Sequence, residues 1–201
     1  YLGCSPDDVE FDGEKVVNLK TKEEITRKEI GNKVMCSSNA PLSATEAFSS
    51  PVSPPPFMVG IAEVEIDKET GVVEPIDYAA VVDCGTVVNP NLARVQTEGG
   101  IAQGIGMALY EDIIYSEKGK NYSNSFMQYK IPSRLDVGEI RVEFESSYEP
   151  TGPFGAKSIG EIVINTPSPA ISNAVQNAVG VIVRELPITA EKVYKGMAEK
   201  E

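Results

Sequence analysis

The chain has 201 residues, of which 41% are hydrophobic and 24% are charged, and its formal net charge is −12. That length and hydrophobic fraction are sufficient for a folded core, which excludes a wholly disordered chain. The acidic balance disfavours nucleic acids and anionic membranes as partners, so we expect neither. No apolar run approaches the roughly 20 residues needed to cross a bilayer, and the sequence shows no signal peptide.

The sequence contains no histidine and three widely separated cysteines, Cys4, Cys36 and Cys84. The lack of histidine excludes histidine-dependent triads and histidine-ligated zinc or iron within this chain. Because no two cysteines form a CxxC pair, the sequence encodes neither a zinc nor an iron–sulfur site, and we predict no metal ligand. Three reduced thiols are typical of the cytoplasm, where we expect the protein, and a reactive Cys84 is the alternative.

The N-terminal part is predicted to contain a hairpin, a helix and an irregular stretch. Apolar residues alternate with acidic ones around an Asp12-Gly13 turn, which predicts a hairpin over residues 7–19. Apolar residues at helical spacing predict a helix over residues 23–35. Five prolines and many serines between residues 37 and 56 exclude a central strand there and indicate a linker or a surface loop.

Residues 57–84 have the strongest strand pattern, with apolar and acidic residues interleaved on both sides of a turn at residues 68–71. This pattern predicts an antiparallel hairpin with one partly solvated face. Residues 111–149 are expected to be β-rich again, with the clearest alternation at 140–144. Together with the predicted helices, the strands indicate an α+β fold of antiparallel β-hairpins or a sheet flanked by helices.

A helix is predicted over residues 90–110, because Asn89 suits the N-cap and Pro90 the first helical position. A neighbouring row places Gln96 and Gln103 on one side, two turns apart, either exposed or facing a buried polar ligand. Four glycines in one helix cost about 1 kcal/mol each relative to alanine unless close packing offsets them. The apolar seam is expected to contain Leu92, Val95, Gly99, Ala102, Gly106 and Leu109.

Two further helices are expected near the C-terminus. The first is predicted to begin at Thr166-Pro167 or Ser168-Pro169, because both are cap-plus-proline patterns, and to end at Gly180. The last helix is predicted to begin at Thr189.

Residues 152–161, Gly-Pro-Phe-Gly-Ala-Lys-Ser-Ile-Gly-Glu, form the most informative stretch. Three glycines within nine positions indicate that the backbone is bent or closely approached. Glu161 stands alone at the end of this loop, directly before the apolar run 162–164. Apolar surroundings would raise the pKa of its carboxyl, which suits a general base, whereas a solvated surface glutamate is the common alternative.

This loop resembles the catalytic loop of the molybdenum hydroxylases, the xanthine dehydrogenase and aldehyde oxidase family. Three further blocks occur in the family's order, at residues 83–90, 96–104 and 165–174. The similarity covers roughly residues 57 to 197, and the sequence before residue 57 is only loosely similar. The resemblance therefore implies that residues 57–201 are the C-terminal part of a molybdopterin-binding domain. Residues 1–56 are expected to form a separate hairpin, helix and Pro/Ser-rich loop.

The resemblance implies oxidative hydroxylation of a purine, another N-heterocycle or an aldehyde, with the oxygen supplied by water. In the family, the glutamate that matches Glu161 is the general base, and the glutamine that matches Gln96 contacts the molybdopterin cofactor. The residue that matches Ile159 lines the metal site, and the pterin holds the molybdenum. Lys157 also matches, and we expect it to form a salt bridge that stiffens the loop.

The family's molybdenum domain is several-fold longer than this chain, which also lacks an initiator methionine, so we expect a piece or a processed part of a larger protein. The implied partners are the remainder of that domain, iron–sulfur and FAD domains or subunits, and a small-molecule substrate. The chain alone is then expected to be inactive, to bind cofactor weakly or not at all, and to expose apolar surface. A non-catalytic assembly subunit or relic is the alternative, and the presence of both Glu161 and Gln96 favours the enzyme.

Overall fold

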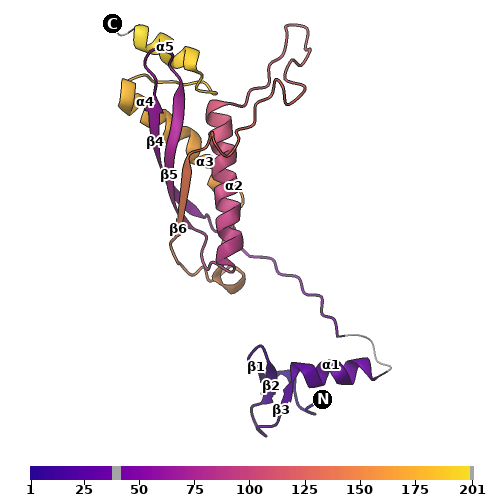
Figure 1. Ribbon diagram of the computed structural model, residues 1–201. Helices are drawn as coiled ribbons and strands as arrows, with labels where there is room; N and C mark the ends of the chain where they lie inside the picture. The colour runs from indigo at the N-terminus through magenta and orange to yellow at the C-terminus, as the bar shows by residue number, and fades with distance from the viewer. Residues whose placement is uncertain (38–41, 200–201) are drawn as a thin grey trace. The chain divides into compact units, whose positions relative to one another are not determined.

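The computed structural model describes residues 1–37 and 42–199, and the chain divides into two compact units, Tyr1–Phe48 and Ser49–Glu201 (Figure 1). The division lies inside the stretch of prolines and serines at residues 37–56. No helix in the described ranges is long and apolar enough to span a membrane.

The N-terminal unit is a small three-stranded antiparallel sheet followed by a helix. Its elements are β1 (Val9–Phe11), β2 (Lys15–Asn18), β3 (Glu24–Thr26) and α1 (Arg27–Met35). The predicted hairpin is therefore present, but the helix expected from residue 23 begins only at Arg27. Thr26 and Glu29 form a capping box, in which each side chain accepts a hydrogen bond from the other residue's backbone N–H. This Thr-x-x-Glu signal places the helix start, and the predicted start at residue 23 did not make use of it.

The second unit is organised around a three-stranded sheet in the order β4-β5-β6. Its strands are β4 (Phe57–Ile66), β5 (Val73–Asp83) and β6 (Glu139–Phe144). The hairpin of β4 and β5 is antiparallel, as expected, but β6 runs parallel to β5, so the sheet is mixed. A parallel neighbour requires a crossover connection, and the helix between β5 and β6 supplies it.

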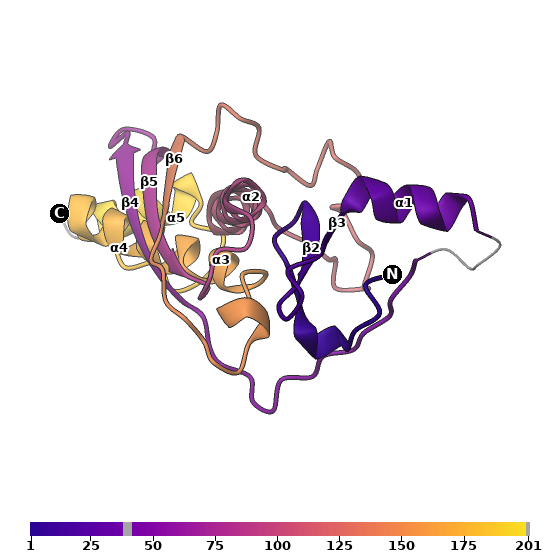
Figure 2. The same ribbon diagram turned by 90° about the horizontal axis from the view of Figure 1, so that it is seen from below.

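The helices of this unit are α2 (Pro90–Leu109), α3 (Ile162–Asn165), α4 (Pro167–Val179) and α5 (Ala190–Ala198). Helix α2 lies beside β6, and α4 lies against β4 (Figure 1, Figure 2). The starts predicted at Asn89 and Thr189 are confirmed, as is the end at Gly180. Of the two starts predicted for α4, Thr166-Pro167 is the one observed and Ser168-Pro169 is not. The α+β class is therefore confirmed, whereas the short helix α3 was not predicted.

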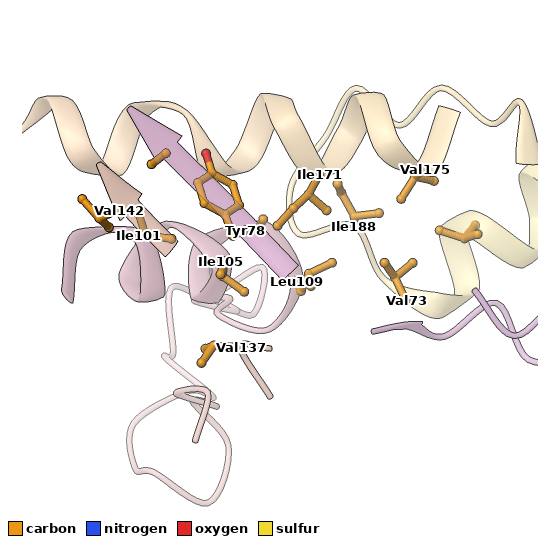
Figure 3. Close-up of a cluster of buried hydrophobic side chains, with 13 residues drawn as sticks. Val73, Tyr78, Ile101, Ile105, Leu109, Val137, Val142, Ile171, Val175 and Ile188 are labelled. Carbon is orange, nitrogen blue, oxygen red and sulfur yellow. The ribbon is translucent and has the colours of Figure 1, made fainter. Parts of the chain in front are cut away.

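The core of this unit lies between the sheet and the two long helices. Figure 3 shows side chains from β5, α2 and α4 gathered around Tyr78, which is 1% exposed. The Tyr78 hydroxyl donates a hydrogen bond to Thr166 Oγ1 at 2.8 Å, which fixes the start of α4 over the sheet. The opposite, outer side of β4 is uncovered, and it presents Phe57, Val59 and Ile61 as exposed apolar side chains.

The β-rich character expected for residues 111–149 is confirmed only at β6, because residues 111–138 are described throughout and form no strand. Only an isolated bridge between Tyr115 and Asn121 is present before β6 begins at Glu139. The segment projects beyond the C-terminal end of α2 (Figure 1), and its Ile113 and Ile114 are exposed. Alternating apolar residues form a strand only where a neighbouring strand is available to pair with them.

Candidate active site

Helix α2 supplies one wall of the site, and its two sides differ sharply in exposure. The buried residues are Thr97, Ile101, Gly104, Ile105, Gly106, Ala108 and Leu109, of which Gly106 and Leu109 belong to the predicted seam. The predicted seam was therefore wrong along its first half, since Leu92, Val95 and Gly99 are all exposed. Apolar residues occur on both sides of this helix, so their spacing alone did not identify the side that faces the core.

The glycines of α2 allow α3 and α4 to approach its backbone. A Cβ on Gly100 would overlap Val163 of α3, and one on Gly104 would lie 2.6 Å from Pro167 Cγ. Val163 is fully buried by this contact, so the segment directly after Glu161 is packed against α2. The predicted role of the glycines in close packing is confirmed at these two positions. Gly99 is different, because a Cβ there would meet no atom within 4 Å from other parts of the described chain.

The glycine-rich loop is attached to the end of β5 by backbone hydrogen bonds. Thr86 N–H donates to Gly155 O at 2.9 Å, and Lys157 N–H donates to Cys84 O at 2.7 Å. Gly85 has a φ of +69°, and a Cβ there would overlap the carbonyl oxygen of Gly155, so glycine is required for this approach. The loop is thus bonded to the chain directly after the sheet.

Side chains strengthen the same attachment. Lys157 Nζ donates to Asp83 Oδ2 at 2.6 Å, so the expected salt bridge is present, and the Lys157 side chain is only 7% exposed. Asp83 also accepts from Ser147 Oγ at 2.6 Å and from Gly85 N–H at 3.0 Å. These hydrogen bonds, with that from Lys157 the largest cause, lower the pKa of Asp83 to about 2. Lys157 was singled out from the sequence, whereas its partner Asp83 and the Ser147 hydroxyl that donates to Asp83 were not.

The three residues that the resemblance singled out lie at two adjoining hollows. One hollow, of about 470 Å³, is lined by Gln96, Gln103 and Glu161 together with Val95, Gly99, Gly100, Gly160 and Ile164. The other, of about 530 Å³, is lined by Gln96 and Ile159, and its walls include the loop that follows β5 and the start of α2. Gln96 and Gly160 border both hollows. The glutamate therefore lies beside the amide-bearing side of α2.

The environment of Glu161 differs from the apolar one that was expected. Glu161 is exposed, and of the apolar run after it only Val163 is buried. Along a helical turn, side chains two positions apart point in nearly opposite directions. Val163 enters the packing against α2, so Glu161 remains on the open side. The described chain therefore positions this carboxylate without enclosing it.

Cys84 lies in the wall of the second hollow and is buried. Burial raises the pKa of its thiol, which disfavours the reactive thiolate. The alternative of a reactive cysteine at this position is therefore not supported.

The donor set around the two hollows fits a polar heterocyclic cofactor. The exposed amides of Gln96 and Gln103 can both donate and accept hydrogen bonds. Gly99 and Gly160 leave the backbone open, since a Cβ at either position would meet no atom within 4 Å among the described residues beyond its own neighbours. Among residues 1–37 and 42–199, no group of three or more acidic, cysteine or histidine side chains could hold a metal ion. A metal held by its own organic ligand is compatible with such a surface.

Comparison with known proteins agrees with this chemistry. The family model for the molybdopterin cofactor-binding domain matches residues 1–138, which defines the class to which the chain belongs. The match begins at residue 1, so the likeness extends further toward the N-terminus than the sequence motifs indicated. It ends before the loop that carries Ile159 and Glu161.

Individual relatives extend the match. The chain is 30% identical to a probable xanthine dehydrogenase subunit from Bacillus subtilis over 210 aligned residues, covering 100% of this chain and 27% of that protein. It is 35% identical to the probable hypoxanthine oxidase of Escherichia coli over 78% of this chain and 16% of that protein. The structure of CO dehydrogenase from Oligotropha carboxidovorans superimposes with a TM-score of 0.79 at 25% identity, covering 96% of this chain and 25% of that chain. The chain belongs to the xanthine dehydrogenase and aldehyde oxidase family of molybdenum hydroxylases.

Proposed function

We propose that this chain is the C-terminal part of the molybdenum-binding polypeptide of a hydroxylase, with Glu161 as the general base. The observation that carries the proposal is the placement of Glu161 and Gln96 in the walls of one hollow, next to a second hollow lined by Ile159. The substrate class that we propose is a purine or another N-heterocycle, with an aldehyde as the second choice. The names of the two bacterial relatives, which refer to xanthine and hypoxanthine, support the purine class.

In this proposal, three side chains bind or line the cofactor, and one side chain, that of Glu161, accepts a proton. The amides of Gln96 and Gln103 would hold the pterin, and Ile159 would line the approach to the metal. When bound, the cofactor supplies molybdenum as the acceptor of two electrons. A carboxylate oxygen of Glu161 accepts the proton that the water-derived nucleophile must lose, which requires hydrogen-bond reach of that nucleophile. Because Glu161 is exposed in this chain, the dry surroundings of the base would come from groups outside it.

The chain spans 16% and 27% of the length of the two bacterial relatives. The remainder of the molybdenum domain and iron–sulfur and FAD modules are therefore the partners that we propose. The chain by itself would then lack activity, because the residues that the structure describes close over neither hollow.

The test is Glu161→Gln in the complete molybdenum-binding polypeptide, assembled with its partners. Removing a general base lowers the rate by about 10²- to 10⁴-fold, so turnover with a purine should fall by that amount. Molybdenum content and thermal stability should stay at the wild-type level, since Glu161 is exposed. Glu185→Gln is the matched control, because Glu185 is also exposed and lines neither hollow. Full activity of a molybdenum-loaded Glu161→Gln enzyme would refute the assignment of Glu161 as the general base, whereas a loaded wild-type complex without turnover would favour the non-catalytic assembly subunit.

A further inference from the structure

The segment that carries Glu161 is held at two buried points, one on each side of the carboxylate. On the N-terminal side, the Lys157 side chain is 7% exposed and is bound to Asp83 at the end of β5. On the C-terminal side, Val163 is 0% exposed and packs against Gly100 of α2. Between these points Ser158, Gly160 and Glu161 are exposed. The position of the carboxylate therefore depends on where the two buried points lie.

The Val163 point is apolar and fixes the segment to α2, whereas the Lys157 point is ionic and fixes it to the sheet. A buried ammonium is stable only when its charge is paired and its hydrogen bonds are satisfied. Asp83 meets that requirement while also accepting from Ser147 Oγ and from Gly85 N–H. One carboxylate thus joins three parts of the chain: the end of β5, the segment after β6 and the glycine-rich loop.

A second acidic residue of β5 provides an internal comparison. Asp77 pairs with Arg141 of β6. The two aspartates are similarly exposed, at 19% for Asp77 and 21% for Asp83, but the Arg141 side chain is 60% exposed, so the cation of this pair is solvated. It joins two neighbouring strands that are already hydrogen-bonded to each other. Exposed pairs of this kind contribute little to structure, whereas the loss of one partner from a buried pair leaves an uncompensated charge.

We propose that Asp83 and Lys157 are positioning residues for Glu161, acting by fixing the glycine-rich loop to the end of the sheet so that the carboxylate faces the amide side of α2. This inference rests on the proposed function of Glu161 as the base. Neither residue is assigned contact with substrate, so the effect passes from Asp83 through Lys157 to the backbone of residues 158–161.

The experiment compares Asp83→Asn, Lys157→Met, Lys157→Arg and the control Asp77→Asn in the complete molybdenum-binding polypeptide with its partners. Small misplacements of a catalytic group cost up to about 100-fold in rate, so Asp83→Asn and Lys157→Met should lower kcat by about 10- to 100-fold. KM should change little, because neither Asp83 nor Lys157 is assigned contact with substrate. Lys157→Arg, which keeps the charge, should restore part of kcat, and Asp77→Asn should match the wild type.

Amide hydrogen exchange of the same proteins gives a readout that does not depend on turnover. Exchange should accelerate at Thr86 and Lys157, whose N–H groups bond across this attachment, in Asp83→Asn and not in Asp77→Asn. If Asp83→Asn fails to fold, Ser147→Ala removes one donor to Asp83 and keeps the ion pair, and it should give a smaller change in the same direction.

Three outcomes separate the two proposals. The inference is supported if Asp83→Asn and Lys157→Met lower kcat, Lys157→Arg restores part of it, and amide hydrogen exchange accelerates locally at Thr86 and Lys157. Wild-type kcat in Asp83→Asn and Lys157→Met, alongside an inactive Glu161→Gln enzyme, overturns the inference and leaves the proposed function intact. An active, loaded Glu161→Gln enzyme overturns the proposed function and, with it, the reaction that the pair was inferred to serve.

Discussion

The inner and outer sides of α2 contain the same residue types in different surroundings. On the inner side, Gly100 and Gly104 are in close contact with Val163 and Pro167, and this contact locates the segment after Glu161. On the outer side, a Cβ added to Gly99 would have no atom from elsewhere in the described chain within 4 Å. Leu92 and Val95 are 67% and 65% exposed on the same helix.

The difference teaches that glycine and apolar residues in α2 serve two separate surfaces. A glycine inside a helix costs about 1 kcal/mol relative to alanine, and on the inner side close packing offsets that amount. On the outer side nothing within the described chain offsets it. An open backbone between two exposed glutamines is suited to contact with a group outside this chain, which agrees with the proposed cofactor. Exposed apolar side chains on α2 and on the outer face of β4 are suited to a larger assembly.

The difference between the inner and outer sides of α2 can be tested most directly with Gly104→Ala. The added methyl would lie 2.6 Å from Pro167 Cγ and 3.1 Å from Ile164 O, and neither atom can move freely. Overpacking of this kind costs about 1–3 kcal/mol, which should appear as a lower free energy of unfolding in a denaturant titration. The matched control is Gly99→Ala, which should stabilise the chain by up to about 1 kcal/mol through helix propensity. Equal destabilisation by both changes would contradict the distinction between the two sides.

A second test addresses the ionic attachment of the loop through the pH dependence of stability. The pKa of Asp83 is lowered from its ordinary 3.8 to about 2, chiefly by its hydrogen bond from Lys157. A lowered pKa in the folded state stabilises the protein above the ordinary value, and this stabilisation is lost as the pH falls through the folded value. Asp83→Asn should therefore lower the free energy of unfolding by about 1–2 kcal/mol at neutral pH. The difference in unfolding free energy between this variant and the wild type should become smaller as the pH falls from about 4 to about 2.

Asp77→Asn is the control for this pH series. The pKa of Asp77 is also lowered, mainly by its hydrogen bond from Arg141, but that pair is solvated. Its loss should change the unfolding free energy by less than about 1 kcal/mol. If the two variants respond to pH in the same way, burial of the Lys157 side chain has no special effect.

The smallest effect on stability is expected on the outer side. Gln96→Ala removes an exposed side chain, so the free energy of unfolding should change by less than about 0.5 kcal/mol. The molybdenum content of the complete enzyme should nevertheless fall, as measured by elemental analysis after purification. Gln176→Ala, at an exposed position of α4, should leave both quantities unchanged. Normal molybdenum content in the Gln96→Ala enzyme would remove Gln96 from the proposed cofactor contacts.

Local signals in the sequence located most of the elements. Asn89, Thr189 and the Thr166-Pro167 pair mark helix starts whose side-chain caps or proline geometry act within one turn. The turn at residues 68–71 likewise defines the β4–β5 hairpin. Signals of this kind depend on neighbours along the chain, so they can be recognised without knowledge of the fold.

Pairing and burial depended on contacts between distant segments. The parallel addition of β6 to β5, the irregular course of residues 111–138 and the buried side of the first half of α2 were missed. Each of them depends on which surface is available for packing, and α2 carries apolar residues on both sides. Spacing alone therefore could not choose between a side that faces this chain's core and one that faces outward.

By itself the sequence determined the α+β class, the resemblance to the molybdenum hydroxylases and the identity of Glu161, Gln96 and Ile159 as candidate site residues. Only the tertiary structure brought these three residues to adjoining hollows and showed that Asp83 and Ser147 hold the loop through Lys157. The physical reason is the distance along the chain over which each signal acts, because caps, turns and residue types depend on only a few neighbouring positions. A site is made by side chains that come together only after the sheet, α2 and the loop have packed.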